Sequence, residues 1–262
     1  MYLTKNENKL SEDFIRDGFL ILKVNQIESL NFIRGYIEGL IYEKISSAKN
    51  NKNILNEFHR YIKIKEINNF RLDFINSLNS ESEIRYSYFD VAKFILNDIV
   101  GNELAMQTKI NLSIQLPKDK SSLLPVHADT WAGDSPYEVV IWIPLVDCYK
   151  TKSMFILPQQ KAQKITENFK NISGQTAKDF YNNIENDLEW LSIPFGHIMI
   201  FNQSLPHGNV VNIEKETRWS MNCRFKSVFS PYGDKKLGEF FEPITLRAAS
   251  RLGMSYKYPK IK

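Results

Sequence analysis

The chain has 262 residues, 43% of them hydrophobic, which suits one globular domain with a sizeable core. Its formal net charge is +4 and its lysines are interspersed with acids, so neither a nucleic-acid nor a membrane partner is indicated. Its two cysteines are too few for a disulfide framework or a zinc cluster, and no signal-peptide core or run of roughly 18 apolar residues is present, so we expect a cytoplasmic protein without a membrane span.

The first hundred residues are predicted to be mainly helical. Ser11 can cap a short helix that ends at Asp17-Gly18, and residues 19–22 are predicted to form a short buried strand. Residues 26–50 and 52–100 follow, with apolar side chains recurring at helical spacing. We expect these helices to pack on the outer, apolar face of a β domain.

Near residue 106 the periodicity changes from helical to two. Polar and apolar side chains alternate along residues 107–116 and again along 218–225. Because Asn, Ser and Gln are poor strand formers, these polar faces favour a barrel or sandwich whose interior holds a polar ligand. Further strands are predicted at residues 138–144, 153–157 and 196–201.

These elements predict one domain over residues 1–262, mainly β with packed helices. Its parts are a helical N-terminal part (1–100), a β core (101–230) with a helical insertion (161–190), and a C-terminal extension (231–262). For the extension, a lid and a subunit contact are both open.

Three residues have the ligand set of a 2-His-1-carboxylate metal site. In an extended segment the side chains of His127 and Asp129 point to the same side, and His207 follows a predicted strand that can lie beside them. Alone, a His-x-Asp pair is more often a surface or capping feature, but the ordered set favours a metal. Mixed nitrogen and oxygen ligands suit Fe(II) and leave positions open for a co-substrate and oxygen. Of the other histidines, His59 lies in a charged helical stretch and His197 inside a strand.

An arginine, Arg218, stands eleven residues after His207 and is predicted to bind a carboxylate. Its planar guanidinium matches a carboxylate with two hydrogen bonds, and the hydroxyl of Ser220 projects to the same face of the strand. Such a pair suits the distal carboxylate of 2-oxoglutarate, whose keto-acid end would chelate the iron. Arg224 faces the same side of the strand. It could bind an anionic part of the substrate or form a salt bridge within the protein, and the sequence favours neither.

Four further residues are candidates for the wall of the pocket that holds co-substrate and substrate. For Asn111 and Gln115, a pocket and a solvated face are equally supported. Trp142 lies between two isoleucines and fits a core position better than a pocket position, although either would shape the site. Trp131 follows the predicted metal ligands and is expected on the same wall.

Several of these segments occur in the order found in one known family. They are residues 14–22, His127-Ala128-Asp129, residues 196–201, His207-Gly208 and Arg218. On them, the chain resembles the Fe(II)/2-oxoglutarate dioxygenases of the phytanoyl-CoA dioxygenase-like superfamily, over roughly residues 10–228. The resemblance implies a double-stranded β-helix, which is a jelly-roll or cupin-like barrel flanked by N-terminal α-helices. It also implies Fe(II) on His127, Asp129 and His207, 2-oxoglutarate on Arg218, and O2 as oxidant.

Within that superfamily, residues 126–137, 142–147 and 152–158 are similar to a bacterial subgroup associated with surface-polysaccharide gene clusters. This similarity implies a sugar substrate, either nucleotide-activated or already glycosidically linked. One departure is Lys150-Thr151-Lys152-Ser153, which replaces a glycine-rich stretch of the family, so the contacts of that stretch are not carried over. Related halogenases have a small residue in place of Asp129, so its presence implies hydroxylation or another hydrogen abstraction, such as alcohol oxidation.

The expected function is therefore an Fe(II)/2-oxoglutarate-dependent oxygenase that acts on a C–H bond of a sugar in surface carbohydrate biosynthesis. One rival is a cupin-like metal-dependent sugar isomerase or epimerase that works without oxygen. Another is a catalytically silent carbohydrate-binding protein, which the intact ligand set disfavours. The sequence leaves open which sugar and carbon react and the oligomeric state, a homo-oligomer included.

Overall fold

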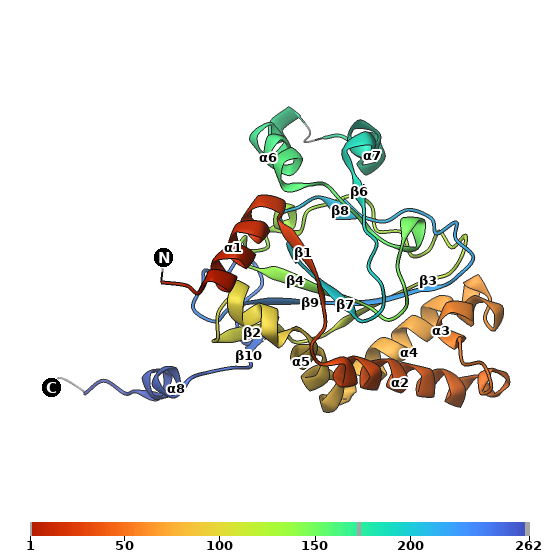
Figure 1. The fold of residues 1–262 in the computed structure, drawn as a ribbon, viewed down its shortest axis with the longest axis horizontal. Helices are drawn as coiled ribbons and strands as arrows, with labels where there is room; N and C mark the ends of the chain where they lie inside the picture. The colour runs from red at the N-terminus through yellow and green to blue at the C-terminus, as the bar shows by residue number, and fades with distance from the viewer. Residues whose placement is uncertain (1, 172–173, 260–262) are drawn as a thin grey trace.

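The computed structural model describes residues 2–171 and 174–259, and over this range the chain forms two antiparallel sheets with helices outside them (Figure 1). Seven of the described strands form a large sheet, in the order β1-β7-β4-β9-β2-β10 with β3 also paired to β9, and three form a small sheet, in the order β6-β5-β8. The strands are β1 Phe19–Lys23, β2 Leu104–Gln107, β3 Asn111–Gln115, β4 Val139–Pro144, β5 Phe155–Ile156, β6 Glu189–Trp190, β7 His197–Asn202, β8 His207–Gly208, β9 Arg218–Ser227 and β10 Phe241–Pro243. The described α-helices are α1 Lys5–Asp17, α2 Ile27–Lys44, α3 Ile54–Glu57, α4 Ile67–Ser80, α5 Ser82–Ile99, α6 Gln159–Glu167, α7 Ala177–Ile184 and α8 Ala248–Ser255.

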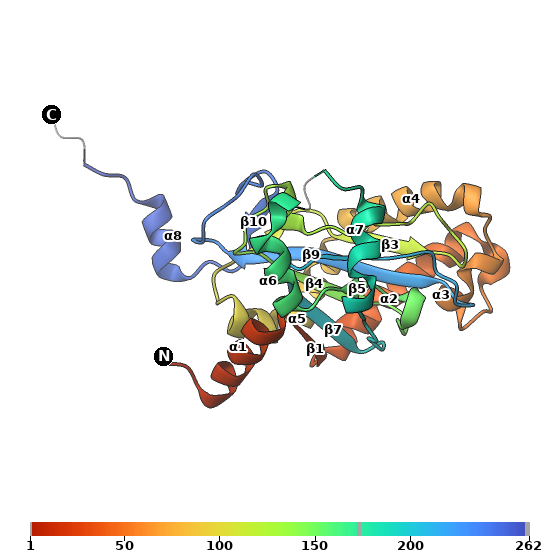
Figure 2. The same ribbon diagram turned by 90° about the horizontal axis from the view of Figure 1, so that it is seen from above.

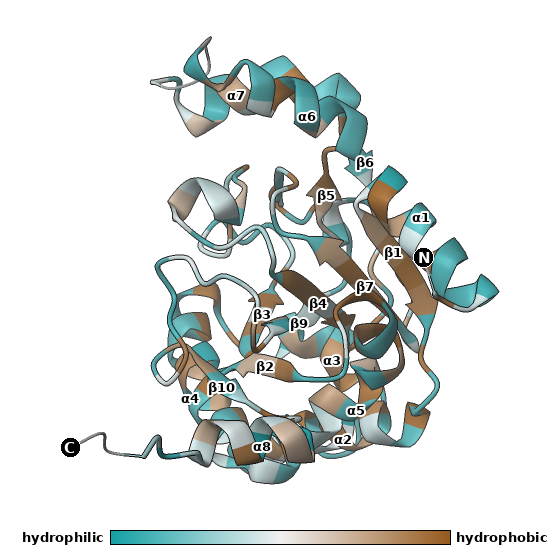
Figure 3. Cartoon of the chain, turned by 90° about the vertical axis from the view of Figure 1, so that its left-hand side faces the viewer, coloured by the Kyte–Doolittle hydropathy of each residue, from teal (hydrophilic) through white to brown (hydrophobic). Residues whose placement is uncertain are grey.

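Helices α2 to α5 cover one side of the large sheet, as expected from their apolar faces (Figures 1 and 3). Trp219 of β9 is fully buried beneath them, with ring centroids 5.0 Å from Phe58 and 5.7 Å from Phe74. The hydroxyl of the buried Tyr88 in α5 donates to the carbonyl of Ile141 in β4 at 2.7 Å. The opposite face of the sheet is therefore left free to carry polar side chains.

The N-terminal helix begins earlier than the sequence predicted, at Lys5 and not after Ser11. Thr4 is its cap: the Thr4 hydroxyl accepts from the amide of Glu7 at 3.2 Å, and the Glu7 carboxylate accepts from the amide of Thr4 at 2.7 Å. The helix ends, as predicted, at Gly18, whose φ of 77° is left-handed. The strand that follows, β1, is half-buried and not buried as expected, because it is the edge strand of the large sheet.

The predicted strand at residues 107–116 is two strands, β2 and β3. Asn79 of α4 separates them, because its side chain accepts from the amide of Ile110 at 2.7 Å and donates to the carbonyl of Ile110 at 3.0 Å. These bonds take the backbone of Ile110 out of the sheet. Both strands pair with the ten-residue strand β9, which spans the break.

The segment between β5 and β6, where a helical insertion was expected, carries α6 and α7, which lie beyond the small sheet (Figure 1). The segment after residue 231 is partly integrated into the fold, since β10 pairs with β2. Helix α8 stands away from the rest of the chain and has no buried residue (Figure 2). Within the described residues, no helix is long and apolar enough to cross a membrane.

Candidate metal centre

The three predicted metal ligands lie together where the small sheet meets the segment before β4. His207 in β8 and His127 exchange two backbone hydrogen bonds, at 2.8 and 3.0 Å, so their side chains lie side by side. Asp129 follows after one extended residue and begins a short 3-10 turn, and its amide donates to the carbonyl of Gln203 at 3.0 Å. One possible ligand atom from each of the three side chains lies within 4.8 Å of the others.

Backbone carbonyls set the orientation of both imidazoles. Nδ1 of His127 lies 2.8 Å from the carbonyl oxygen of Pro125, and Nδ1 of His207 lies 2.9 Å from that of Leu205. Because a carbonyl only accepts, each Nδ1 carries the proton and donates it, which leaves the lone pair of Nε2 for a metal. Nε2 of His127 is 3.5 Å from Oδ1 of Asp129, on the side where an ion would be held.

The protonation states of His207 and Asp129 also fit a metal site. Burial and the neighbouring His127 lower the pKa of His207 to about 4, so this imidazole is neutral at neutral pH. Burial would raise the pKa of Asp129, but the hydrogen bond with His127 and the positive charge of Arg224 outweigh it and hold the pKa well below its usual range. Neutral imidazole and ionised carboxylate are the forms that bind a metal ion. Two nitrogens and one oxygen are a donor set that suits Fe(II).

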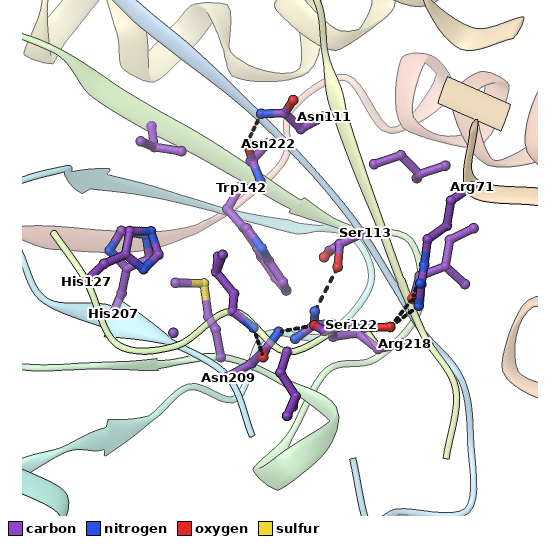
Figure 4. Close-up of a pocket in the computed structure, with 18 of the residues that line it drawn as sticks. Arg71, Asn111, Ser113, Ser122, His127, Trp142, His207, Asn209, Arg218 and Asn222 are labelled. Carbon is purple, nitrogen blue, oxygen red and sulfur yellow. Dashed lines mark hydrogen bonds between the residues drawn. The ribbon is translucent and has the colours of Figure 1, made fainter. Parts of the chain in front are cut away.

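The triad opens into a cavity of about 530 Å³ that also contains Arg218 (Figure 4). Trp142 lies between the two histidines and Arg218, and Ser220 lines the same cavity. Of the candidates for the pocket wall, Asn111 is at the cavity and bonds to Asn222, whose Oδ1 accepts from Asn111 Nδ2 at 2.9 Å. Trp142 is only 5% exposed, so it belongs both to the core and to the wall.

Arg218 is a buried cation without an acidic partner among the described residues. It is 3% exposed, and it donates from Nη1 to the carbonyl of Ser153 at 3.0 Å and from Nη2 to the hydroxyl of Ser113 at 2.8 Å. Its Nε has no hydrogen-bond partner in the described part of the chain. Burial lowers the pKa of Arg218 to about 10, which still leaves it charged at neutral pH. A buried charge of this kind is costly unless an anion compensates it.

Two of the expected wall residues lie elsewhere in the structure. Gln115 is fully buried outside the residues that line the cavity, because its Nε2 donates to the carbonyl of Val210 at 2.7 Å. Trp131 is also outside the lining and packs on the insertion, with ring centroids 5.3 Å from Phe169 and 5.6 Å from Phe180. The alternation of polar and apolar residues along a strand does not predict these tertiary contacts of Gln115 and Trp131.

The cavity includes polar groups that the sequence did not single out. Asn209 lies two residues after His207, and its Oδ1 accepts from the amide of Leu124 at 2.8 Å. Arg71 reaches the cavity from α4 and pairs with Asp119 at 2.7 Å. The position of Asn209 beside a metal ligand was a usable signal. No sequence signal pointed to Arg71 as a cavity residue, because α4 was expected only to pack outside the barrel.

The partner of Arg224, which the sequence left open, is Asp129, one of the three predicted metal ligands. Its Nη2 lies 3.0 Å from Oδ2 of Asp129 and 3.4 Å from Oδ2 of Asp134. Its side chain is 16% exposed and lines the cavity beside the triad. The salt bridge is thus the alternative that the structure supports.

Comparisons with known proteins identify the fold. No family model matches the sequence, and a search of curated proteins finds no match. Among solved structures, the chain is similar to a non-heme monooxygenase, the ThoJ–nickel complex (14% identity, TM-score 0.56, covering 92% of this chain and 85% of that chain). It is also similar to HygX from Streptomyces hygroscopicus with nickel and 2-oxoglutarate bound (12%, 0.55, 90% and 90%) and to AviO1 from Streptomyces viridochromogenes Tue57 (14%, 0.52, 88% and 99%). This likeness, with the two-sheet topology, confirms the predicted double-stranded β-helix flanked by helices.

Proposed function

We propose that this chain is a non-heme Fe(II)/2-oxoglutarate-dependent oxygenase. The observation that carries the proposal is the buried, unpaired Arg218 in the same cavity as a 2-His-1-carboxylate set. Arg218 requires an anion, and the 2-His-1-carboxylate set suits a metal ion. 2-Oxoglutarate can bind to both, because it has a carboxylate at one end and a chelating keto acid at the other. The similar structures with nickel, and with nickel and 2-oxoglutarate, support the same cofactors.

In this proposal, His127, Asp129 and His207 hold the iron, and Arg218 with the hydroxyl of Ser220 holds the distal carboxylate of 2-oxoglutarate. The bound iron, with 2-oxoglutarate and O2, supplies the oxidising power for attack on a C–H bond. The protein positions the reactants, and the buried Trp142 forms an apolar wall of the cavity between the clamp and the triad. The carboxylate of Asp129 is retained, which favours hydroxylation or alcohol oxidation.

The proposed substrate is a sugar, nucleotide-activated or glycosidically linked, in surface carbohydrate biosynthesis in the cytoplasm. Amide groups at the cavity support a polyhydroxylated substrate, because Asn111 and Asn222 line it and amides both donate to and accept from hydroxyls. Further support is the similarity of residues 126–137 to the carbohydrate-cluster subgroup.

The test is succinate release from 2-oxoglutarate in the presence of Fe(II), O2 and a panel of nucleotide-sugars and neutral glycosides. We expect substrate-dependent succinate formation, and we expect its loss in His127→Ala, which removes one iron ligand. Conversion of a sugar without consumption of 2-oxoglutarate would contradict the proposal and favour the isomerase or epimerase alternative. Sugar binding without any conversion would favour a silent binding protein.

A further inference from the structure

Arg224 occupies one oxygen of the carboxylate ligand. Its Nη2 is 3.0 Å from Oδ2 of Asp129, whereas Oδ1 is the oxygen that lies 3.5 Å from Nε2 of His127. We propose that Arg224 is a positioning residue that holds Oδ2 and so presents Oδ1 alone to the metal. The inference rests on the proposed function only in requiring that the triad binds a metal ion.

The guanidinium of Arg224 is itself held from several sides. Its Nε donates to Oε1 of Gln203 at 3.0 Å, and its carbon lies 5.7 Å from the ring centroid of Phe240. Gln203 is fully buried and is fixed in turn, because its Nε2 donates to Oε2 of Glu138 at 2.9 Å. The carbonyl of the same Gln203 accepts from the amide of Asp129. Gln203 thus fixes both the backbone of Asp129 and the guanidinium of Arg224, which binds the Asp129 carboxylate.

The segment between β9 and β10 completes this support. Asp134, which lies 3.4 Å from Arg224, also pairs with Lys235 at 2.5 Å, and Lys235 lies 4.8 Å from the ring centroid of Phe240. The amide of Asp234 donates to the carbonyl of Gly133 at 3.1 Å, so this segment lies against the loop that follows the triad carboxylate. Residues 231–241, predicted as part of an extension, therefore contribute to the surroundings of the metal centre.

A role for Arg224 in binding an anionic part of the substrate is disfavoured by its charge balance. Two carboxylates, those of Asp129 and Asp134, already lie within 3.4 Å of its Nη2. A third anion would have to compete with both. By contrast, groups that orient a metal ligand commonly change metal affinity by about 10- to 100-fold when they are removed.

The experiment is a titration of the full chain with Co(II) alone, without 2-oxoglutarate or substrate, followed by the visible d–d absorption of the bound ion. We expect Arg224→Gln to weaken Co(II) binding by about 10- to 100-fold. We expect Arg224→Lys, which keeps the charge but not the planar fork, to lie between Arg224→Gln and the wild type. The matched control is Asn222→Ala, two residues earlier on the same face of β9, which bonds to Asn111 and is expected to keep the wild-type affinity for Co(II).

Wild-type Co(II) affinity and spectrum in Arg224→Gln would overturn the inference, and a raised KM for substrate in that variant would then assign Arg224 to substrate. If Arg224→Gln does not fold, Arg224→Lys decides, and an unchanged affinity and spectrum there also overturn the inference. Absence of Co(II) binding in the wild type would overturn the metal site and the proposed function together. The titration contains no 2-oxoglutarate. If the protein binds a metal ion but is not an oxygenase, the result of the Co(II) titration is therefore unchanged.

Discussion

Burial changes the chemistry of single residues around the site, with opposite consequences for different groups. It lowers the pKa of Arg218 to about 10 and, together with the charge of His127, that of His207 to about 4, because a charged form loses hydration when it is buried. Arg218 keeps its charge and so favours an anionic ligand. His207 loses its charge and so is ready to bind a metal. Burial thus leaves Arg218 charged, as binding the distal carboxylate of 2-oxoglutarate requires, and His207 neutral, as binding the metal requires.

The two cysteines are predicted to be unreactive in the native protein. Burial raises the pKa of Cys148 and of Cys223 to about 12, and both thiols are buried. Since the thiolate is the reactive form, neither should react with 5,5′-dithiobis(2-nitrobenzoate) at pH 8 within the time that the unfolded chain reacts fully. Release of one equivalent of thionitrobenzoate from the native protein would contradict this.

At the residue scale, the sequence predicted the triad and Arg218 because their spacing along two segments is a local property. It could not predict that Arg224 binds Asp129, because that contact joins β9 to a loop some 95 residues earlier in the chain. Gln115 was a candidate for the pocket wall, but the structure places it outside the cavity lining, for a related reason. Its strand alternation is the same whether the side chain faces a cavity or bonds to the carbonyl of Val210.

Among the elements, the segment between β3 and the triad depends on α4. Arg71 donates to the carbonyl of Ile114 at 2.7 Å and pairs with the buried Asp119, which also accepts from Ser121 and Ser122. This cluster fixes the segment that leads to His127. The sequence predicted the helix and the strand but not their connection, just as Asn79, a single side chain, divides the predicted strand 107–116 in two.

We predict that Arg71→Ala destabilises the protein by about 3 kcal/mol, because it leaves the buried Asp119 carboxylate without its cation. The measurement is urea unfolding at pH 7 and at lower pH. Burial raises the pKa of Asp119, but hydrogen bonds from Ser122 and Ser121 and the charge of Arg71 outweigh it, so the folded-state pKa lies below the usual value. The stability that Asp119 contributes is therefore present above about pH 4 and is lost as the pH falls further.

The loss of stability in Arg71→Ala should accordingly shrink as the pH falls from about 4 through the lowered folded-state pKa of Asp119, where the carboxylate becomes protonated. Lys44→Ala is a suitable control, since it breaks the exposed pair with Asp73 and should cost less than about 1 kcal/mol. Equal effects of the two substitutions at pH 7 would show that the Arg71 cluster does not hold this segment.

On the scale of the whole molecule, the double-stranded β-helix brings together residues from both halves of the core. The small sheet carries His207, the large sheet carries Arg218 and Trp142, and the loop between β3 and β4 carries Asp129. The alternating strands predicted a barrel or sandwich, and the resemblance to the dioxygenase family implied the double-stranded β-helix. Neither predicted the closure of β10 onto β2, because three residues of strand leave too short a pattern to recognise.

Helix α8 is predicted to be dispensable for the stability of the single chain. It has no buried residue and stands away from the sheets (Figure 2), so removal of residues 248–262 should change the free energy of unfolding by no more than about 0.5 kcal/mol. Urea unfolding and light scattering would test this together. A large loss of stability, coupled to a change from oligomer to monomer, would instead assign α8 to a subunit contact.

In the proposed function, one cavity holds iron on His127, Asp129 and His207 and 2-oxoglutarate on Arg218. Anaerobic addition of Fe(II) and 2-oxoglutarate tests it most directly, through the weak visible metal-to-ligand absorption of the chelate. We expect this band for the wild type, its absence in His207→Ala, and a much weaker affinity for 2-oxoglutarate in Arg218→Met. No band in the wild type, or an unchanged 2-oxoglutarate affinity in Arg218→Met, would contradict it.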